Sequence, residues 1–162
     1  MIQIRRINPD EWTAAKRVVY RVALDIFKDP RPLEESMAYY EARHELEDMD
    51  DIQKNYFEDG GIFLVMFDDE TLICTGAIRQ WKDDICELKR LWLLPEYHGQ
   101  GLGYRIMQEL LAFARTQGYK KIRLETDREV QIRAQVFYKQ IGFHEIPGYT
   151  DQEGEIAMEM DL

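Results

Sequence analysis

The sequence predicts an α+β fold: a mixed, mostly antiparallel central sheet flanked by helices. Two observations support this prediction. Apolar residues recur at helical spacing up to about residue 57, and then gather in strand-like runs of branched residues from Gly61 to Leu94. Short turns join these runs, as in an antiparallel meander. Beyond His98, helical and strand-like stretches alternate, so the expected order is β-α-α-β-β-β-α-β-α-β-β.

The length and composition fit one domain spanning residues 1–162, since the chain is 45% apolar and 32% charged. A formal net charge of −10 argues against a nucleic-acid partner, because such proteins normally carry a basic face. No stretch reads as a membrane span or a signal peptide. Cys74 and Cys86 lie in strand-like runs and are expected to be buried thiols, so we expect a cytoplasmic protein.

The N-terminal part predicts a strand of about five residues at Ile2 and then two helices. Asn8 and Pro9 suit the cap and first position of the first helix, which Asp29-Pro30-Arg31-Pro32 ends. The second helix, residues 33–49, is very acidic. We favour a solvated face for it, and the alternative is a face toward a cationic acceptor such as a polyamine.

The C-terminal part predicts a helix from Leu102 to Gly118, a strand KIRLET, a helix over residues 128–140, and a closing strand pair. Apolar spacing places four side chains of the 128–140 helix inward: Ile132, Val136, Phe137 and Ile141.

The stretch from Ile85 to Gln117 organises the chain. A strand there meets the turn His98-Gly99-Gln100-Gly101-Leu102-Gly103, and a helix follows. Glycines let the backbone curl closely around a ligand, and the free N–H groups at a helix start form a phosphate-sized anion site. We therefore predict that a phosphorylated cofactor lies along this turn.

Two known glycine-rich turns fit poorly. A P-loop needs Lys and then Ser or Thr after its last glycine, whereas Tyr104-Arg105 follow here. A dinucleotide fold would explain Glu125, an acid about twenty residues on, but it needs GxGxxG instead of GxGxG. Residues 95–98 also separate the strand from the glycines. A nicotinamide-dependent enzyme remains the weakest alternative.

The turn resembles the signature of the GNAT (general N-acetyltransferase) superfamily, Gln/Arg-x-x-Gly-x-Gly/Ala, with His98 in the first position. Downstream, RLET, Ala134, Phe137-Tyr138 and Gly142-Phe143 are similar to the strand, helix and FY…GF ending of that family. Gln131 stands where the family commonly has Asn. The resemblance covers Gly61 to the C-terminus, and the first two helices only in outline.

This resemblance implies a GNAT-like fold that binds acetyl-CoA. Turn amides would hold the pyrophosphate, and the pantetheine arm would pair with the central strand like an added strand. The N–H of Leu93 would polarise the thioester carbonyl. The cofactor-binding residues implied are Leu91, Trp92, Leu93, His98, Gly99, Gln100, Gly101, Leu102, Gly103, Tyr104, Gln131 and Tyr138.

Two catalytic residues are predicted for direct attack of an amine on the thioester. Tyr138 matches the family Tyr that faces the coenzyme sulfur, so it would protonate the departing thiolate. Glu87 is the candidate base that takes a proton from the acceptor ammonium. The alternatives are a water relay, or a Glu87 that simply pairs with Lys89 or Arg79.

The predicted acceptor is a primary amine of a small molecule or peptide, with no metal, no nucleic acid and no membrane partner. An N-terminal peptide amine or an amino-acid derivative is as compatible with the sequence as a polyamine. His and Cys residues lack metal-ligand spacing. Tyr39, Tyr40 and Tyr149 are candidates for lining the acceptor pocket. The family resemblance also implies that the protein could form a homodimer. The alternative function is a non-catalytic acyl-CoA-binding regulatory module.

Overall fold

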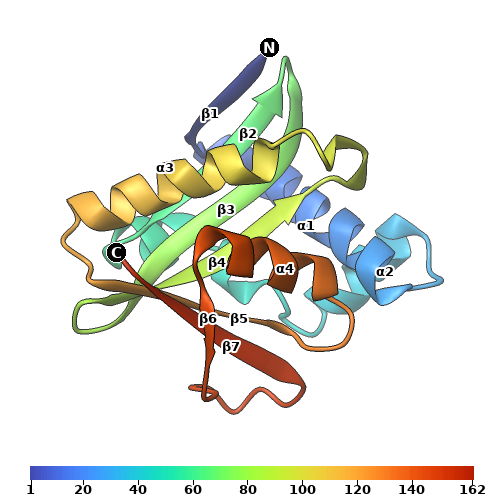
Figure 1. Ribbon diagram of the computed structural model, residues 1–162. Helices are drawn as coiled ribbons and strands as arrows, with labels where there is room; N and C mark the ends of the chain where they lie inside the picture. Colours follow the sequence, from blue (N-terminus) through green and yellow to red (C-terminus); the bar gives the residue numbers. More distant parts are fainter.

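The computed structural model describes all residues, 1–162, and contains one seven-stranded sheet in the order β1-β2-β3-β4-β5-β7-β6 (Figure 1). Neighbouring strands run antiparallel except β4 and β5. This confirms the predicted α+β class. The strands are β1 (Ile2–Arg6), β2 (Ile62–Asp68), β3 (Thr71–Lys82), β4 (Ile85–Leu93), β5 (Lys121–Asp127), β6 (His144–Ile146) and β7 (Glu155–Asp161).

Helices cover both faces of the sheet. Figure 1 shows α3 and α4 on the near face, with α1 and α2 behind it. The α-helices are α1 (Trp12–Phe27), α2 (Leu33–Glu41), α3 (Leu102–Thr116) and α4 (Ile132–Ile141). The short helical turns are η1 (Pro9–Glu11), η2 (Glu47–Met49), η3 (Gln53–Phe57) and η4 (Pro95–Tyr97). No helix combines the length and apolar character needed to cross a membrane.

Two hydrophobic cores hold these layers together, and β2 contributes to both. Leu64 and Met66 point into the larger core with α3, while Phe63 and Val65 point into the smaller core with α1 and η3. Side chains alternate between the faces of a strand, so a strand covered on both faces reads as a continuous apolar run. Burying each such side chain contributes about 1.5–3 kcal/mol.

The sheet opens between its two parallel strands. β4 pairs with β5 only from Ile85–Lys121 to Glu87–Arg123. Beyond that point, the pairing of β4 with β3 shifts register, and Arg90 adopts a left-handed backbone with φ 55°. An extra residue in one strand is a β-bulge, which bends the strand and raises its twist. The bulge thus falls where β4 and β5 stop pairing.

Two helix predictions were wrong in extent. The predicted helix 33–49 ends at Glu41, because the chain turns through His44 at φ 57° and continues as η2. The predicted helix 128–140 begins only at Ile132, because the Asp127 carboxylate accepts hydrogen bonds from the N–H groups of Glu129 and Val130, 2.9 and 2.8 Å away. Such an Asx turn competes with a helix.

The inward face of α4 was predicted correctly only in part, since Phe137 and Ile141 are partly buried and pack against the larger core but the other two residues do not. Ile132 and Val136 are 53% and 50% exposed. The buried residues of α4 are Gln135 and Tyr138. Gln135 donates two hydrogen bonds, each 3.0 Å long, to the carbonyls of residues 127 and 128, so a polar side chain fixes the orientation of the helix.

Candidate functional site

The turn between β4 and α3 has a backbone that requires glycine. Gly99 and Gly101 have φ values of 77° and 75°, a conformation that residues with a Cβ rarely adopt. An added Cβ at either position would meet no atom within 4 Å, so the constraint is conformational, not steric. Gly103 is different, because it has no such φ and a Cβ there would lie 3.7 Å from the Phe137 ring of α4.

The amides of this turn have no acceptors within the protein. The His98 N–H donates to the Pro95 carbonyl and the Arg105 N–H to the Gly101 carbonyl, each at 3.1 Å. The N–H groups of residues 99–104, which lie between them, make no intramolecular hydrogen bond. They stand at the start of α3, where the helix dipole favours negative charge. The turn is therefore a site that could bind an anion such as a phosphate.

His98 connects this turn to the end of β4. Its Nε2 lies 3.0 Å from the Leu93 carbonyl oxygen, to which the protonated nitrogen donates. The Leu94 N–H bonds to the Ile73 carbonyl on β3 at 3.0 Å, so the polar groups of Leu93 face the other way, toward the opening beside β5. His98 thus occupies the Leu93 carbonyl and leaves the Leu93 N–H facing the opening.

A cavity of about 590 Å³ passes through this opening. Tyr20 of α1 and Tyr138 of α4 both line it, although these helices cover opposite faces of the sheet (Figure 1). The cavity therefore connects the two faces between β4 and β5. Of the residues proposed from the sequence, it brings together Glu87, Leu91, Trp92, Gln131 and Tyr138. Tyr40 also lines it, whereas Tyr39 lies in a separate, more open hollow.

Tyr138 places a hydroxyl group at this cavity. Its side chain is 7% exposed and packs between the rings of Phe137 and Phe143, whose centroids both lie 5.6 Å away. The hydroxyl has no hydrogen-bond partner in the protein, although a buried Tyr usually finds one. Burial raises the pKa of Tyr138, so the phenol keeps its proton at neutral pH.

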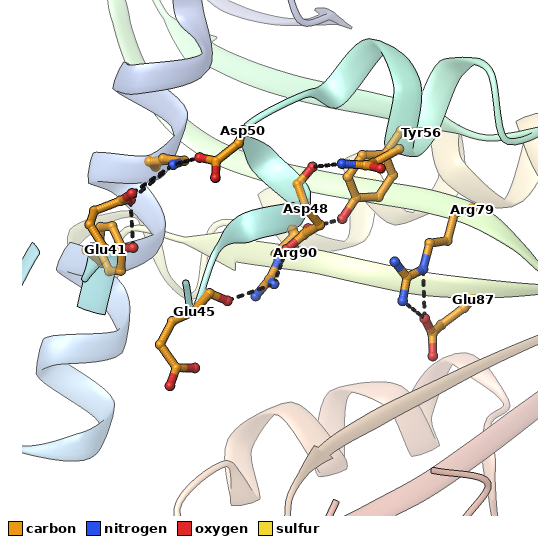
Figure 2. A network of polar contacts seen from close by, with 11 residues as sticks. Glu41, Glu45, Asp48, Asp50, Tyr56, Arg79, Glu87 and Arg90 are labelled. Carbon is orange, nitrogen blue, oxygen red and sulfur yellow. Dashed lines mark hydrogen bonds and ion pairs between the residues drawn. The ribbon is translucent and has the colours of Figure 1, made fainter. Parts of the chain in front are cut away.

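Glu87 is buried, at 4% exposure, and it pairs with Arg79, one of the two partners considered from the sequence. Its Oε1 accepts from Arg79 Nε and NH2 at 3.1 and 3.0 Å, the contact drawn in Figure 2. Its Oε2 accepts from the Tyr149 hydroxyl at 2.8 Å, and the Tyr149 ring packs edge-on against Trp81. Hydrogen bonds to both carboxylate oxygens thus orient Glu87. Tyr149, considered from the sequence only as a residue lining the acceptor pocket, is not among the residues that line the cavity, and it bonds Glu87 instead.

Gln131 stabilises the turn between β5 and α4. Its Oε1 accepts from the Thr126 hydroxyl at 2.9 Å and from the Asp127 N–H at 2.8 Å. The amide nitrogen Nε2 has no acceptor in the protein, and the residue lines the cavity. Gln131 can therefore present a donor to a bound ligand while its oxygen holds the local backbone.

The acidic segment around α2 binds cations of the same chain. Glu41 accepts from Lys16 at 3.0 Å and from the Tyr20 hydroxyl at 2.8 Å, and Lys16 also pairs with Asp50. Asp48 bonds the Arg90 guanidinium through both oxygens and also bonds Tyr56 (Figure 2). Glu41 and Asp48 are therefore partly buried and paired within the chain. The other acids of the segment are exposed, as the predicted solvated face requires: Glu34, Glu35, Glu45, Glu47, Asp50 and Asp51.

Comparison with known proteins agrees with this geometry. Residues 25–143 match the model of the Acetyltransferase (GNAT) family. Human N-acetyltransferase 8B is 33% identical over 102 residues, which are 59% of this chain and 44% of that protein. The chain therefore covers less than half of the length of that relative.

Solved structures share the fold. A GNAT-family acetyltransferase from Staphylococcus aureus superimposes with a TM-score of 0.84 at 18% identity, covering 100% of this chain and 99% of its own. The PaiA N-acetyltransferase from Thermoplasma acidophilum, solved in complex with coenzyme A, gives 0.79 at 22% identity, with 100% and 99% coverage. With the family model spanning most of the sequence and the fold in agreement, the chain belongs to the GNAT family of acetyltransferases.

Proposed function

We propose that this protein is an acetyl-CoA-dependent N-acetyltransferase that transfers an acetyl group to a primary amine by direct attack on the thioester. The observation that carries the proposal is the run of unbonded N–H groups at residues 99–104, next to the opening between β4 and β5. Those amides suit the diphosphate of coenzyme A. The PaiA neighbour, whose structure contains coenzyme A, supports the choice of ligand.

The strand edge beside the opening suits the pantetheine arm. Beyond Glu87, β4 has no pairing partner on the β5 side, so the backbone of residues 91–93, apart from the Leu93 carbonyl that His98 occupies, is available for strand-like pairing. The Leu93 N–H faces the opening and is our candidate for polarising the thioester carbonyl. Leu91, Trp92 and Gln131 line the same cavity.

Proton transfers are assigned to two side chains of this cavity. The amine attacks only as the neutral base, so the acceptor ammonium first loses a proton, for which Glu87 is our candidate base. The amine nitrogen then bonds to the acetyl carbon and the carbon–sulfur bond breaks. Tyr138, which keeps its proton at neutral pH, protonates the departing thiolate.

Release of free thiol from acetyl-CoA tests this function. We expect thiol release that depends on an added amine, and much less of it in Tyr138→Phe. Binding of acetyl-CoA without thiol release for any amine would instead support the non-catalytic acyl-CoA-binding module. A thermal shift with NAD but not with acetyl-CoA would contradict both.

We also propose that the enzyme works in the cytoplasm. Cys74 and Cys86 are both buried free thiols, which fits a reducing compartment. Their burial raises the pKa of each thiol to about 12, so neither is a ready nucleophile, and an acyl-cysteine route has no support.

A further inference from the structure

One cation in the cavity has no partner. Arg79, Lys89 and Arg90 are the basic residues that line it. Arg79 is bound to Glu87, and Arg90 is bound to Asp48. The ammonium group of Lys89 makes no hydrogen bond, and no carboxylate oxygen lies within 4.0 Å of its nitrogen.

The acidic residues of the cavity do not neutralise Lys89. Glu87 is engaged by Arg79 and Tyr149, and Glu125 accepts from the N–H and hydroxyl of Thr150 at 3.1 and 2.6 Å. The other two acids that line the cavity, Glu45 and Glu155, form no ion pair.

The surroundings disfavour an unpaired ammonium at this position. Lys89 is half-buried on β4, next in the chain to Arg90. Burial lowers the pKa of Lys89, as do the charges of Arg90 and Arg79, against a smaller opposing effect of Glu87 and Asp48. A ligand carboxylate placed against Lys89 would supply the missing counter-charge, and a charge-assisted hydrogen bond there would be strong.

The position of Lys89 fits the acceptor and not the cofactor. Glu87, Lys89, Arg90 and Arg79 gather on the sheet face that α1 and η2 cover, whereas Tyr138 and the turn before α3 belong to the other face. Lys89 precedes Leu91 by two residues, which is at most about 7 Å along a strand and less across the bulge at Arg90. An acceptor amine near the Leu91–Leu93 edge could therefore carry a second group that reaches Lys89.

We propose that Lys89 binds a carboxylate of the acceptor, so that the substrate is an amine that also carries a carboxylate, such as a free amino acid or a short peptide. This inference rests on the proposed N-acetyltransferase function. We prefer it to the cationic polyamine considered from the sequence, because four acids around α2, Glu34, Glu41, Asp48 and Asp50, are already paired with Arg17, Lys16 and Arg90. Glu45 and Glu155 line the same cavity and form no ion pair, so their carboxylates are available to the positive charge of a zwitterionic acceptor.

The test compares matched acceptors on four proteins, one of which is a control. Thiol release from acetyl-CoA is measured with the common amino acids, their amides and the corresponding dipeptides, on wild type, Lys89→Met and Lys89→Arg. Lys82→Met is the matched control, since Lys82 is an exposed lysine at the end of β3 without an ion pair, outside the cavity. We expect Lys89→Met to raise KM at least about tenfold for carboxylate acceptors, and to leave KM for their amides unchanged.

Lys89→Arg distinguishes charge recognition from proton transfer. A guanidinium binds carboxylates but does not act as a base, so Lys89→Arg should restore much of the affinity if recognition is the role. Equal activity with amides and acids, unchanged by Lys89→Met, would overturn the inference and leave the acetyltransferase function standing. Thiol release with no amine at all would overturn both.

Product binding gives a readout that does not depend on turnover. The N-acetyl derivative of the best amino acid keeps the carboxylate, so it should bind the coenzyme A complex of wild type and of Lys82→Met equally well. Binding to the complex of Lys89→Met should be at least about tenfold weaker. Identical affinities for all three proteins would contradict the assignment, and an unchanged melting temperature would show that Lys89→Met is folded.

Discussion

Asp48 holds Arg90 in the left-handed conformation that forms the bulge of β4. Its two carboxylate oxygens accept from Arg90 Nε and NH2, at 3.0 and 2.5 Å, and both side chains are less than one-fifth exposed, at 14% and 17%. Asp48 lies in η2, in the segment after α2. The segment after α2 is therefore bonded directly to β4 at the point where β4 separates from β5.

Asp48→Asn should destabilise the fold by about 2 to 3 kcal/mol, because it leaves the Arg90 charge without its partner. Burial alone would raise the pKa of Asp48, but the hydrogen bonds and charge of Arg90 outweigh it and hold the pKa at about 2, below its usual 3.8. A depressed carboxyl pKa stabilises the fold above the unfolded value and loses that effect as pH falls through the folded value. Urea unfolding of wild type and variant should therefore differ most above about pH 5, and less toward pH 2.

Glu34→Gln is the control for this pair. The Glu34 and Arg17 side chains also form a 2.5 Å contact, but they are 74% and 46% exposed, and such surface pairs contribute about 0–1 kcal/mol. An equal loss of stability in both variants, or a gap between wild type and Asp48→Asn that grows as the pH falls, would contradict the role given to Asp48.

Gly101→Ala should weaken acetyl-CoA binding at least about tenfold, because an L residue at a φ of 75° costs about 1–2 kcal/mol and the turn would relax away from it. Gly118→Ala is a matched control at the other end of α3, with a φ of 88° and equally open space around its Cβ. Both variants should lose similar stability on thermal unfolding, but only Gly101→Ala should lose affinity by calorimetric titration. An equal loss of affinity in Gly101→Ala and Gly118→Ala would contradict binding of the cofactor by the turn.

Tyr138→Phe should lower kcat about 100-fold while the Kd for acetyl-CoA stays the same, since the change removes a proton donor and keeps the packing with Phe137 and Phe143. Tyr97→Phe is the control, because it removes a hydroxyl that bonds only Asp68, at 3.2 Å, away from the cavity. Turnover measured with thiol-sensitive dye checks both. Unchanged kcat in Tyr138→Phe would remove Tyr138 from the mechanism.

Glu87→Gln should lower kcat/KM and alter the acidic limb of its pH profile, because Gln cannot take a proton from the acceptor. Tyr149→Phe tests whether a change in the position of the Glu87 carboxylate alone can explain the loss of activity. It removes one hydrogen bond to Glu87 but keeps the carboxylate. We expect Tyr149→Phe to lower the rate with no change in the shape of the profile. Superimposable profiles for Glu87→Gln and wild type would leave a water relay as the base.

The sequence predicted the parts of this fold that depend on local patterns. Alternation and branched residues located β2, β3 and β4, and the glycines located the start of α3. These features depend on residues close together in the chain. The same holds for the turn at Gly99 and Gly101, whose positive φ values glycine adopts without strain.

The errors arose where residues distant in the chain decide the structure. Nothing near Asp48 in the sequence indicates Arg90, so the acidic segment was predicted to be one solvated helix. In the structure it is a short helix followed by a segment in which Asp48 pairs with Arg90. Ile132 and Val136 have helical apolar spacing, yet they are exposed because Gln135 and Tyr138 face the sheet. Lys89 could not be told from Arg79 as a partner of Glu87 until the cross-strand register was known.

Amide chemical shifts of the ¹⁵N-labelled protein during an acetyl-CoA titration test the central claim most directly. The account predicts that acetyl-CoA causes the largest changes in chemical shift at the N–H groups of residues 99–104, which have no acceptor in the free protein. The start of α1, around Trp12, should not respond. Shifts concentrated elsewhere, with the amides of the turn unmoved at saturation, would contradict it.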